Sequence, residues 1–267
     1  MNLRRVGAVV LRQLYLYRSS PQRVLPLFIW VALDIVLWGF ITRFLGQVSR
    51  SSFNFVPALL GAVLLWDFLT RVMQGITTAF FEDVWSRNFL NVFATPMRTS
   101  EYLTGLVAIG VTNSFVALLV MFTLAWALFG LSFLAYGVAL VPFLGVLFLT
   151  GIGLGVLGAA MVLRLGPASE WLIWPIPTLL APFAGVFYRL NVLPGWMQIV
   201  AKALPPSYVF EGMRAVVSGK PAPWDQLAIG GGLALIYLAL ACAAFAAVYR
   251  FAIRTGLIAR YSAETVS

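Results

Sequence analysis

The chain has 267 residues, of which 61% are hydrophobic and only 10% are charged, and its formal net charge is +9. Soluble domains are about 45–50% apolar and about 25% charged, so this composition excludes a water-soluble globule and predicts an integral membrane protein. The absence of His and the single Cys242 exclude His-based catalysis, His metal ligands and an intrachain disulfide. We therefore expect no catalytic residue and no metal site. We also expect no nucleic-acid partner despite the positive net charge, because basic residues in a membrane protein usually flank the cytoplasmic ends of its helices.

The first expected element is an amphipathic helix within residues 1–20. At about 100° per residue, one face of this helix is apolar and the opposite face is basic. The apolar face holds Leu3, Val6, Val10, Leu14 and Tyr17, and the basic face holds Arg4, Arg5 and Arg12. Such a helix lies in the plane of the membrane interface, where Arg side chains reach anionic headgroups. It is also a candidate docking surface for a cytoplasmic partner.

Six segments are long and apolar enough to cross a bilayer, which takes about 20 mostly apolar residues. They are Val24–Leu45, Phe55–Met73, Tyr102–Gly130, Phe133–Leu163, Trp171–Tyr188 and Leu227–Phe251. Arginines gather near both ends of the chain, so both termini are expected in the cytoplasm, which requires an even number of spans. The sequence therefore predicts an all-α, multi-pass protein that forms one transmembrane domain over residues 1–267.

Ionisable residues are rare inside these spans. Asp34 lies near the middle of the first span, where a charge costs at least about 3 kcal/mol unless it is paired or hydrated. Asp67 is four residues before Arg71 in the second span, a spacing that favours an ion pair along one helix. For Asp34, a structural hydrogen bond or a wet cavity is the simpler interpretation, and a proton relay is the alternative.

Two later spans carry residues that shape helix packing. Gly151 and Gly155 form a Gly-x-x-x-Gly pattern in the fourth span, which suits either packing within the chain or dimerisation. The fifth span is interrupted by Pro175, Pro177 and Pro182, and each proline removes a helix hydrogen bond. We therefore expect a close helix contact at the fourth span and a kink in the fifth.

The loop between the second and third spans, residues 82–96, is expected to form a short cytoplasmic helix. Glu82 and Asp83 favour a helix N-terminus electrostatically, and Pro96 stops the helix by biasing the residue before it towards an extended backbone. One side of this helix holds Trp85, Phe89, Val92 and Phe93, and another holds Arg87, Asn88 and Asn91. Exposed aromatic residues favour docking to a partner protein, and the alternative is a helix that lies on lipid.

The outer segment, residues 191–225, contains two short amphipathic pieces, Trp196–Ala203 and Ser207–Val217, divided by a Pro-Pro pair. Neither piece is long enough to cross a bilayer, so both are expected to be re-entrant or to lie at the outer surface. Glu211 and Arg214 are three residues apart and are predicted to pair on one helix face. If the pieces are re-entrant, they cap an exit path.

Together these features resemble the ABC-2 type family of ABC-transporter permeases. Two local motifs carry the resemblance: Glu82–Pro96 with the lead into the third span, and Leu204–Arg214, which is similar to a Pro-x-x-Tyr-x-x-Glu-x-x-Arg pattern. The resemblance implies that the first motif is a coupling helix that fits a cleft on a nucleotide-binding subunit. Its docking residues would be Glu82, Asp83, Trp85, Arg87, Phe89, Phe93 and Pro96, and the gating residues of the second motif would be Pro206, Tyr208, Glu211 and Arg214.

The same resemblance implies the permease subunit of an ATP-driven exporter in the inner membrane, with a second permease chain that is expected to be identical. No Gly-x-x-x-x-Gly-Lys-Ser/Thr motif occurs, so no cofactor is expected in this chain, and a separate ABC ATPase would bind ATP and Mg²⁺. The aromatic, charge-poor spans favour a lipid-like or amphipathic substrate, and a lipid-linked glycan is the other candidate.

Two other classes of function compete with the exporter. A secondary transporter would use an ion gradient through Asp34, but it predicts paired or chained carboxylates and an internal repeat, which the sequence lacks. A membrane-embedded enzyme predicts clustered acidic, His or Ser/Lys groups, whereas the nine acidic residues are scattered.

Overall fold

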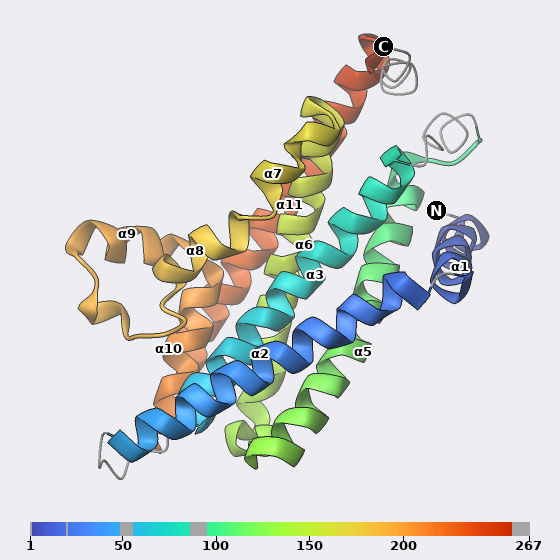
Figure 1. Cartoon of the computed structure of the whole chain (residues 1–267). Coiled ribbons are helices and arrows are strands. Elements are labelled where there is room, and N and C mark those ends of the chain that lie inside the picture. The colour runs from blue at the N-terminus through green and yellow to red at the C-terminus, as the bar shows by residue number, and fades with distance from the viewer. Residues whose placement is uncertain (1, 20, 49–55, 86–94, 258–267) are drawn as a thin grey trace.

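The computed structural model describes residues 2–19, 21–48, 56–85 and 95–257. Within these residues every regular element is a helix, and five helices are long and apolar enough to cross a membrane. The long helices are α2 (Pro21–Val48), α3 (Gly61–Trp85) after the π-helical turn η1 (Val56–Leu60), α5 (Thr99–Phe129), α6 (Leu140–Leu165) after the 3₁₀ turn η2 (Phe133–Ala139), and α11 (Trp224–Arg254) (Figure 1). The short elements are α1 (Leu3–Ser19), η3 (Pro167–Ser169), α7 (Glu170–Ile173), α8 (Ile176–Ala184), η4 (Leu190–Val192), α9 (Gly195–Ala203) and α10 (Pro205–Val217).

Five of the six expected spans are present as long helices, and the largest shift is at the end of α3, which continues past Met73 to Trp85. The expected span Trp171–Tyr188 is not one long helix, so the count of six spans is not confirmed. The helix breaks between α7 and α8 because Pro175 and Pro177 cannot donate the hydrogen bonds that would join them.

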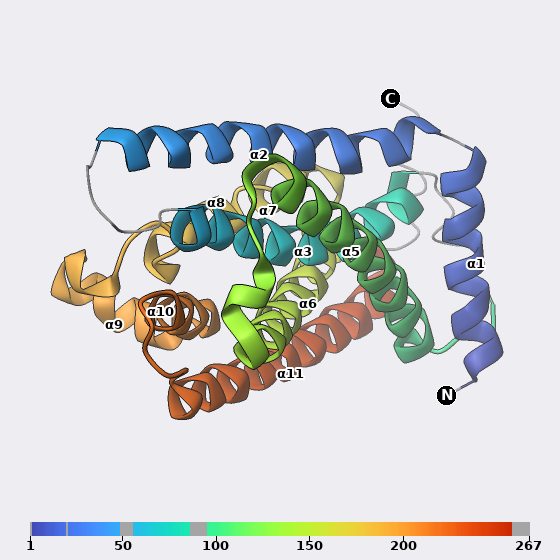
Figure 2. The same ribbon diagram turned by 90° about the horizontal axis from the view of Figure 1, so that it is seen from below.

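The helix α6 lies inside the bundle and packs against α3 on one side and α11 on another. The helix α3 also packs against α5, and α5 in turn contacts α1 and α2. Figure 2 shows α2 and α11 along opposite edges of the bundle. Large apolar side chains on both edge helices are exposed, as expected for surfaces that face lipid or another apolar partner.

The glycines of α6 allow this helix to approach its neighbours closely. A Cβ atom on Gly151 would lie 2.8 Å from the carbonyl oxygen of Leu69, and one on Gly155 would lie 2.9 Å from that of Met73. Both distances are shorter than real Cβ contacts, so any side chain at these positions would push α3 away. The Gly-x-x-x-Gly pattern is therefore used for packing within the chain.

The short helices between α6 and α11 return along the bundle. In Figure 1, α8 and α9 lie near the middle of the bundle's length, and α10 continues to the end where α11 begins. The helices α9 and α10 occupy the positions of the two short amphipathic pieces, and the Pro-Pro pair forms the first turn of α10. This segment is thus a chain of short helices along the bundle and not a single rod.

The two ends of the bundle differ in charge. The helix α1, the start of α5 and the ends of α3, α6 and α11 lie at one end, at the upper right of Figure 1. Described basic residues of these elements are Arg4, Arg5, Arg12, Arg18, Arg98, Arg164, Arg250 and Arg254. We call this the basic end of the bundle.

Candidate functional site

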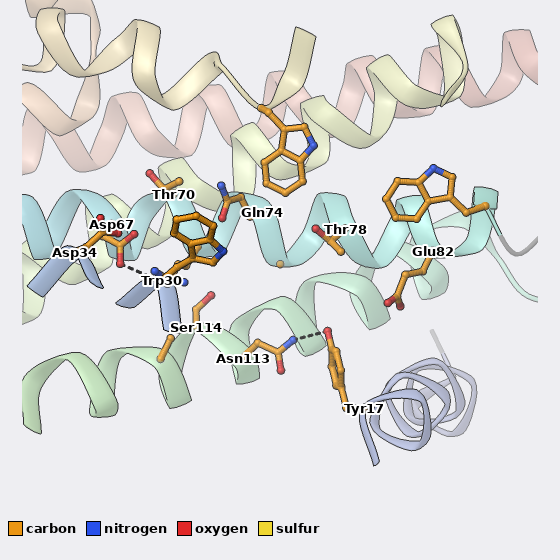
Figure 3. Close-up of a pocket in the computed structure, with 15 residues that line it drawn as sticks. Tyr17, Trp30, Asp34, Asp67, Thr70, Gln74, Thr78, Glu82, Asn113 and Ser114 are labelled. Carbon is orange, nitrogen blue, oxygen red and sulfur yellow. Dashed lines mark hydrogen bonds and ion pairs between the residues drawn. The ribbon is translucent and has the colours of Figure 1, made fainter. Parts of the chain in front are cut away.

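A cavity of about 720 Å³ lies beside α3 (Figure 3). Side chains from α1, α2, α3 and α5 and the turn after α7 line it. Cavities that hold drug-sized ligands measure about 300–1,000 Å³ and place a few polar groups among apolar walls. The size and mixed lining of this cavity therefore suit a medium-sized organic molecule.

One face of α3 supplies the polar wall of the cavity. Polar side chains recur at every third or fourth residue, so they share a single face of the helix. They are Asp67, Thr70, Arg71, Gln74, Thr78 and Glu82. The opposite face is buried core and includes Leu69, Val72 and Ile76. Asp67, Arg71 and Glu82 were predicted site residues, but the polar stripe that joins them was not predicted, although its helical period is present in the sequence.

The predicted pair on α3 forms: Arg71 donates from Nε to Asp67 Oδ2 at 2.7 Å. Asp34 reaches the same place from α2 and lies beside Asp67 in Figure 3. Both carboxylates also line a smaller neighbouring cavity of about 220 Å³, which shares Thr70 and Gln74 with the larger one. The two cavities therefore adjoin at these polar residues, and we call the pair the polar path along α3. This position favours the cavity interpretation of Asp34.

Aromatic residues form the other walls of the large cavity. Trp30 of α2, Trp85 at the end of α3 and Trp174 after α7 all line it. Trp174 donates from Nε1 to Glu170 Oε1 at 2.9 Å, and Trp85 stacks on Phe81 with ring centroids 5.2 Å apart. These contacts orient two of the three indole rings.

At the basic end, the carboxylate of Asp83 is buried, and its side chain joins three helices. Asp83 Oδ2 accepts hydrogen bonds from Arg12 Nη2 of α1 at 2.7 Å and from Tyr102 Oη of α5 at 2.6 Å. Asp83 itself, in the last turn of α3, is only 2% exposed. A buried carboxylate needs such partners, so this cluster fixes α1 against α3 and α5.

A second ion pair holds the beginning of α1. Arg5 Nη1 lies 3.3 Å from Glu101 Oε2, and Glu101 also accepts from the backbone amides of Asn2 and Arg98, at 2.7 and 3.0 Å. Arg5 also donates to the carbonyl oxygen of Pro96. The helix α1 is thereby connected to the stretch that leads into α5.

These contacts correct the expected orientation of α1. Arg5 and Arg12 do not share a face that points away from the protein, since both pair with carboxylates of the bundle. The buried side of α1 contains Val6, Val9 and Gln13. The carboxylates of Glu101 and Asp83 attract Arg5 and Arg12, and these contacts set which face of α1 meets the bundle. A helical wheel of α1 shows only the residues of α1, so it could not include the two carboxylates.

The predicted pair in α10 also forms, and it has further contacts. Arg214 donates from Nη2 to Glu211 Oε1 at 2.9 Å and from Nη1 to the carbonyl oxygen of Gly185 at 2.7 Å. The same Glu211 oxygen accepts from the backbone amide of Leu190 at 2.9 Å. Burial lowers the pKa of Arg214, and the Glu211 carboxylate opposes this shift. The pair is therefore a link between α10 and the chain after α8, and not a solvated surface pair.

The other two expected gating residues hold the corner between α9 and α10. Pro206 is buried in the first turn of α10, and Tyr208 Oη donates to the carbonyl oxygen of Lys202 at 2.8 Å. The four residues of the second motif thus lie together on α10 and connect it to α8 and α9.

Long apolar helices, a broken helical segment before α11 and polar-lined cavities beside α3 together describe a multi-pass membrane protein with space for a ligand. A family model described as "ABC-2 type transporter" matches residues 5–217. The chain belongs to this family. As an ABC-2 permease it is a multi-pass membrane component of an ABC transporter, which implies an ABC ATPase partner, and it is not itself catalytic. A comparison with curated protein sequences gave no match.

In this ABC-2 permease the expected docking residues are only partly described. The expectation that Glu82 and Asp83 begin a new helix is wrong, because α3 continues through both to Trp85. The helix dipole disfavours acidic residues in a last turn, but Arg12 compensates the charge of Asp83 there. Trp85 and Pro96 are exposed. Arg87, Phe89 and Phe93 lie outside the described residues.

Proposed function

We propose that the chain is the permease subunit of an ATP-driven exporter that moves a lipid-like or amphipathic molecule across the membrane. A lipid-linked glycan is a second substrate class within this proposal. The polar path along α3 carries the proposal, because polar groups inside a membrane-spanning bundle are costly and mark substrate pathways.

The energy for transport comes from a separate ABC ATPase, which binds ATP and Mg²⁺. Two identical permease chains complete the path, one for each ATPase subunit. The basic end of the bundle faces the cytoplasm of a cell whose inner membrane holds the protein, in line with the positive-inside rule. Closure of the ATPases on ATP then switches the permease between two states of different substrate affinity.

Residues 82–96 act as the coupling segment that docks on the ATPase. Trp85, Arg87, Phe89, Phe93 and Pro96 supply the contact, together with Glu82. Asp83 has a different part in this proposal, since its carboxylate is buried against Arg12 and Tyr102. It anchors the segment to the bundle, so that a push from the ATPase moves α1, α3 and α5 together.

The helix α3 connects the two parts of this mechanism. Its last turn leads into the coupling segment, and its polar face is a wall of the cavity. A displacement of the end of α3 therefore changes the shape of the cavity directly. On the far side, the link from Glu211 and Arg214 to Gly185 holds α10 in place and acts as the outer gate.

The proposal is tested by affinity purification of the detergent-solubilised chain from native membranes, followed by mass spectrometry and an ATPase assay. We expect an ABC ATPase to co-purify in a one-to-one ratio. Phe89→Glu and Phe93→Glu should abolish its co-purification, because a charge cannot be buried in an apolar docking cleft.

Leu134→Glu is the matched control, since Leu134 is an exposed apolar residue of η2 at the opposite end of the bundle. Unchanged complex formation in both Phe variants would refute the docking segment. A chain that purifies alone and without ATPase activity would refute the exporter and favour ion-driven transport through Asp34.

A further inference from the structure

A separate cavity of about 620 Å³ lies at the basic end of the bundle, where the start of α1 meets the start of α5. Three of its described lining side chains carry a guanidinium group and one carries a carboxylate, so positive charge is in excess there. The described lining is Asn2, Leu3, Arg4, Arg5, Arg98 and Glu101. None of these residues belongs to the described lining of the cavity beside α3, so the two cavities are distinct.

The carboxylate of this lining is already surrounded by donors. Glu101 accepts hydrogen bonds from the backbone amides of Asn2 and Arg98, at 2.7 and 3.0 Å. The guanidinium of Arg5 lies 3.3 Å from the same carboxylate. These contacts hold α1 against α5, and they leave Glu101 little capacity to neutralise any other cation of the cavity.

The charges of Arg4 and Arg98 are not compensated in this way. Both side chains are exposed, and neither forms an ion pair with another residue that the structure describes. Residues 86–94, which precede this stretch in the sequence, contain Arg87 and no acidic residue. Two guanidinium groups from different helices therefore share one cavity without a carboxylate of their own.

Two helix N-termini add to the positive potential. The helix α1 begins at Leu3, and α5 begins at Thr99, directly after Arg98. The first amides of a helix have no partner within it, and its dipole is positive at this end, so a helix N-terminus favours a phosphate group. A guanidinium fork also matches phosphate oxygens, with two parallel hydrogen bonds. The chemistry of this cavity thus suits a phosphate ester.

The outer face of α1 indicates the source of that phosphate. Apolar side chains on this face are between 45% and 75% exposed: Leu3, Leu11, Leu14 and Tyr15. Figure 2 shows α1 lying across the basic end of the bundle, crosswise to α2. A helix with an exposed apolar face in this orientation lies in the membrane interface. Leu3 belongs both to this face and to the cavity lining, which puts the cavity at the level of the lipid headgroups.

We propose that the cavity between the starts of α1 and α5 binds the phosphate headgroup of an anionic phospholipid, and that Arg4 and Arg98 contact this phosphate. The inference goes beyond the proposed transport function, because it assigns a lipid that stays in its leaflet and needs neither substrate nor ATPase. A zwitterionic lipid such as phosphatidylcholine carries a cationic choline beside its phosphate. The two guanidinium groups repel that choline, so the site discriminates between the two kinds of lipid.

Native mass spectrometry of the full chain in a non-ionic detergent, with its ATPase where one co-purifies, tests the inference by counting bound lipids. Phosphatidylglycerol and phosphatidylcholine with the same acyl chains are titrated separately. We expect one phosphatidylglycerol per chain to bind with a lower Kd than any phosphatidylcholine. Inorganic phosphate at millimolar concentration should not displace it, because the free ion lacks the acyl chains that add to the affinity of the lipid.

Glutamine variants locate the site. Arg4→Gln and Arg98→Gln should each raise the Kd for phosphatidylglycerol about fivefold, and the double variant about 25-fold, in line with the contribution of one basic residue near an anionic lipid surface. Arg18→Gln is the matched control, since Arg18 is an exposed arginine of the same helix that does not belong to the described lining. It removes the same charge and should leave the Kd unchanged. Because all three side chains are exposed, the variants should keep the thermal unfolding midpoint of the parent in detergent without added lipid.

Three results would overturn the inference: equal Kd values for the two lipids, an unchanged Kd in the double variant, or an equal effect of Arg18→Gln and Arg4→Gln. The last result would mean that the arginines act only through a general attraction between the basic end and anionic lipid. Displacement of phosphatidylglycerol by millimolar inorganic phosphate would overturn the lipid as the source of the phosphate and assign the free ion instead.

Discussion

The contact between Arg12 and Asp83 predicts an unusual pattern of stability in a double-mutant cycle. Arg12→Ala leaves a carboxylate that is only 2% exposed without its charged partner. Removing one partner of a buried ion pair costs about 3–5 kcal/mol. The Arg12 side chain is 29% exposed, and Tyr102 still donates to Asp83, so we expect a smaller loss of about 2–4 kcal/mol.

The second step of the cycle neutralises the carboxylate. Asp83→Asn preserves the size of the side chain and a hydrogen-bond acceptor for Tyr102, but it removes the buried charge. The double variant Arg12→Ala/Asp83→Asn should therefore be more stable than Arg12→Ala alone. Two independent sites would give the opposite order, because their losses would add.

Hydrogen exchange of the α1 backbone amides, measured by mass spectrometry, reports the local free energy directly. A loss of about 2–4 kcal/mol corresponds to roughly 30- to 700-fold faster exchange in Arg12→Ala, and the double variant should recover a large part of this. The exposed Arg4 of the same helix provides the control, since Arg4→Ala should change stability by less than about 0.5 kcal/mol. Equal exchange in Arg12→Ala and the double variant would refute the coupling.

Two further substitutions test the packing of α6 and the link to α10. Gly155→Leu should lower the thermal unfolding midpoint, because overpacking against α3 reduces the free energy of unfolding by about 1–3 kcal/mol. Gly145→Leu is the control and should leave the midpoint unchanged, because Gly145 of α6 faces open space. Equal midpoints would contradict the close approach. Arg214→Lys should slow transport in reconstituted vesicles as much as Arg214→Ala, because an ammonium group cannot reproduce the forked contact with Glu211 and Gly185. Wild-type transport by the Lys variant would show that the fork is not needed.

The sequence predicted best those features that depend on neighbouring residues. The pairs Asp67–Arg71 and Glu211–Arg214 are one helical turn apart, so helix geometry alone brings them together. The break at Pro175 follows in the same way from the local loss of hydrogen-bond donors. Long apolar runs likewise identified five of the membrane-spanning helices.

The features that were not predicted from the sequence depend on residues far apart along the chain. The partner of Asp83 is 71 positions away along the chain, and without it two consecutive acidic residues favour a helix start and not a last turn. The contacts of Arg214 with Gly185 and of Glu211 with Leu190 are also long-range. The cavity is assembled from several helices, so only its wall on α3 had a pattern that could be found in one segment.

The break between α7 and α8 has a mechanical consequence for the return path. A continuous helix is a stiff rod that carries tension and torque from one end to the other, as α3 can between its last turn at Trp85 and the cavity. The segment with α7, α8 and α10 is interrupted after Trp174 and again at Gly185, where the backbone is left-handed with φ at 66°. Torque applied at Trp174 is lost at these joints before it reaches α10. The cavity wall at Trp174 can therefore rearrange around a ligand while α10 keeps its hold on the half of the bundle away from α1.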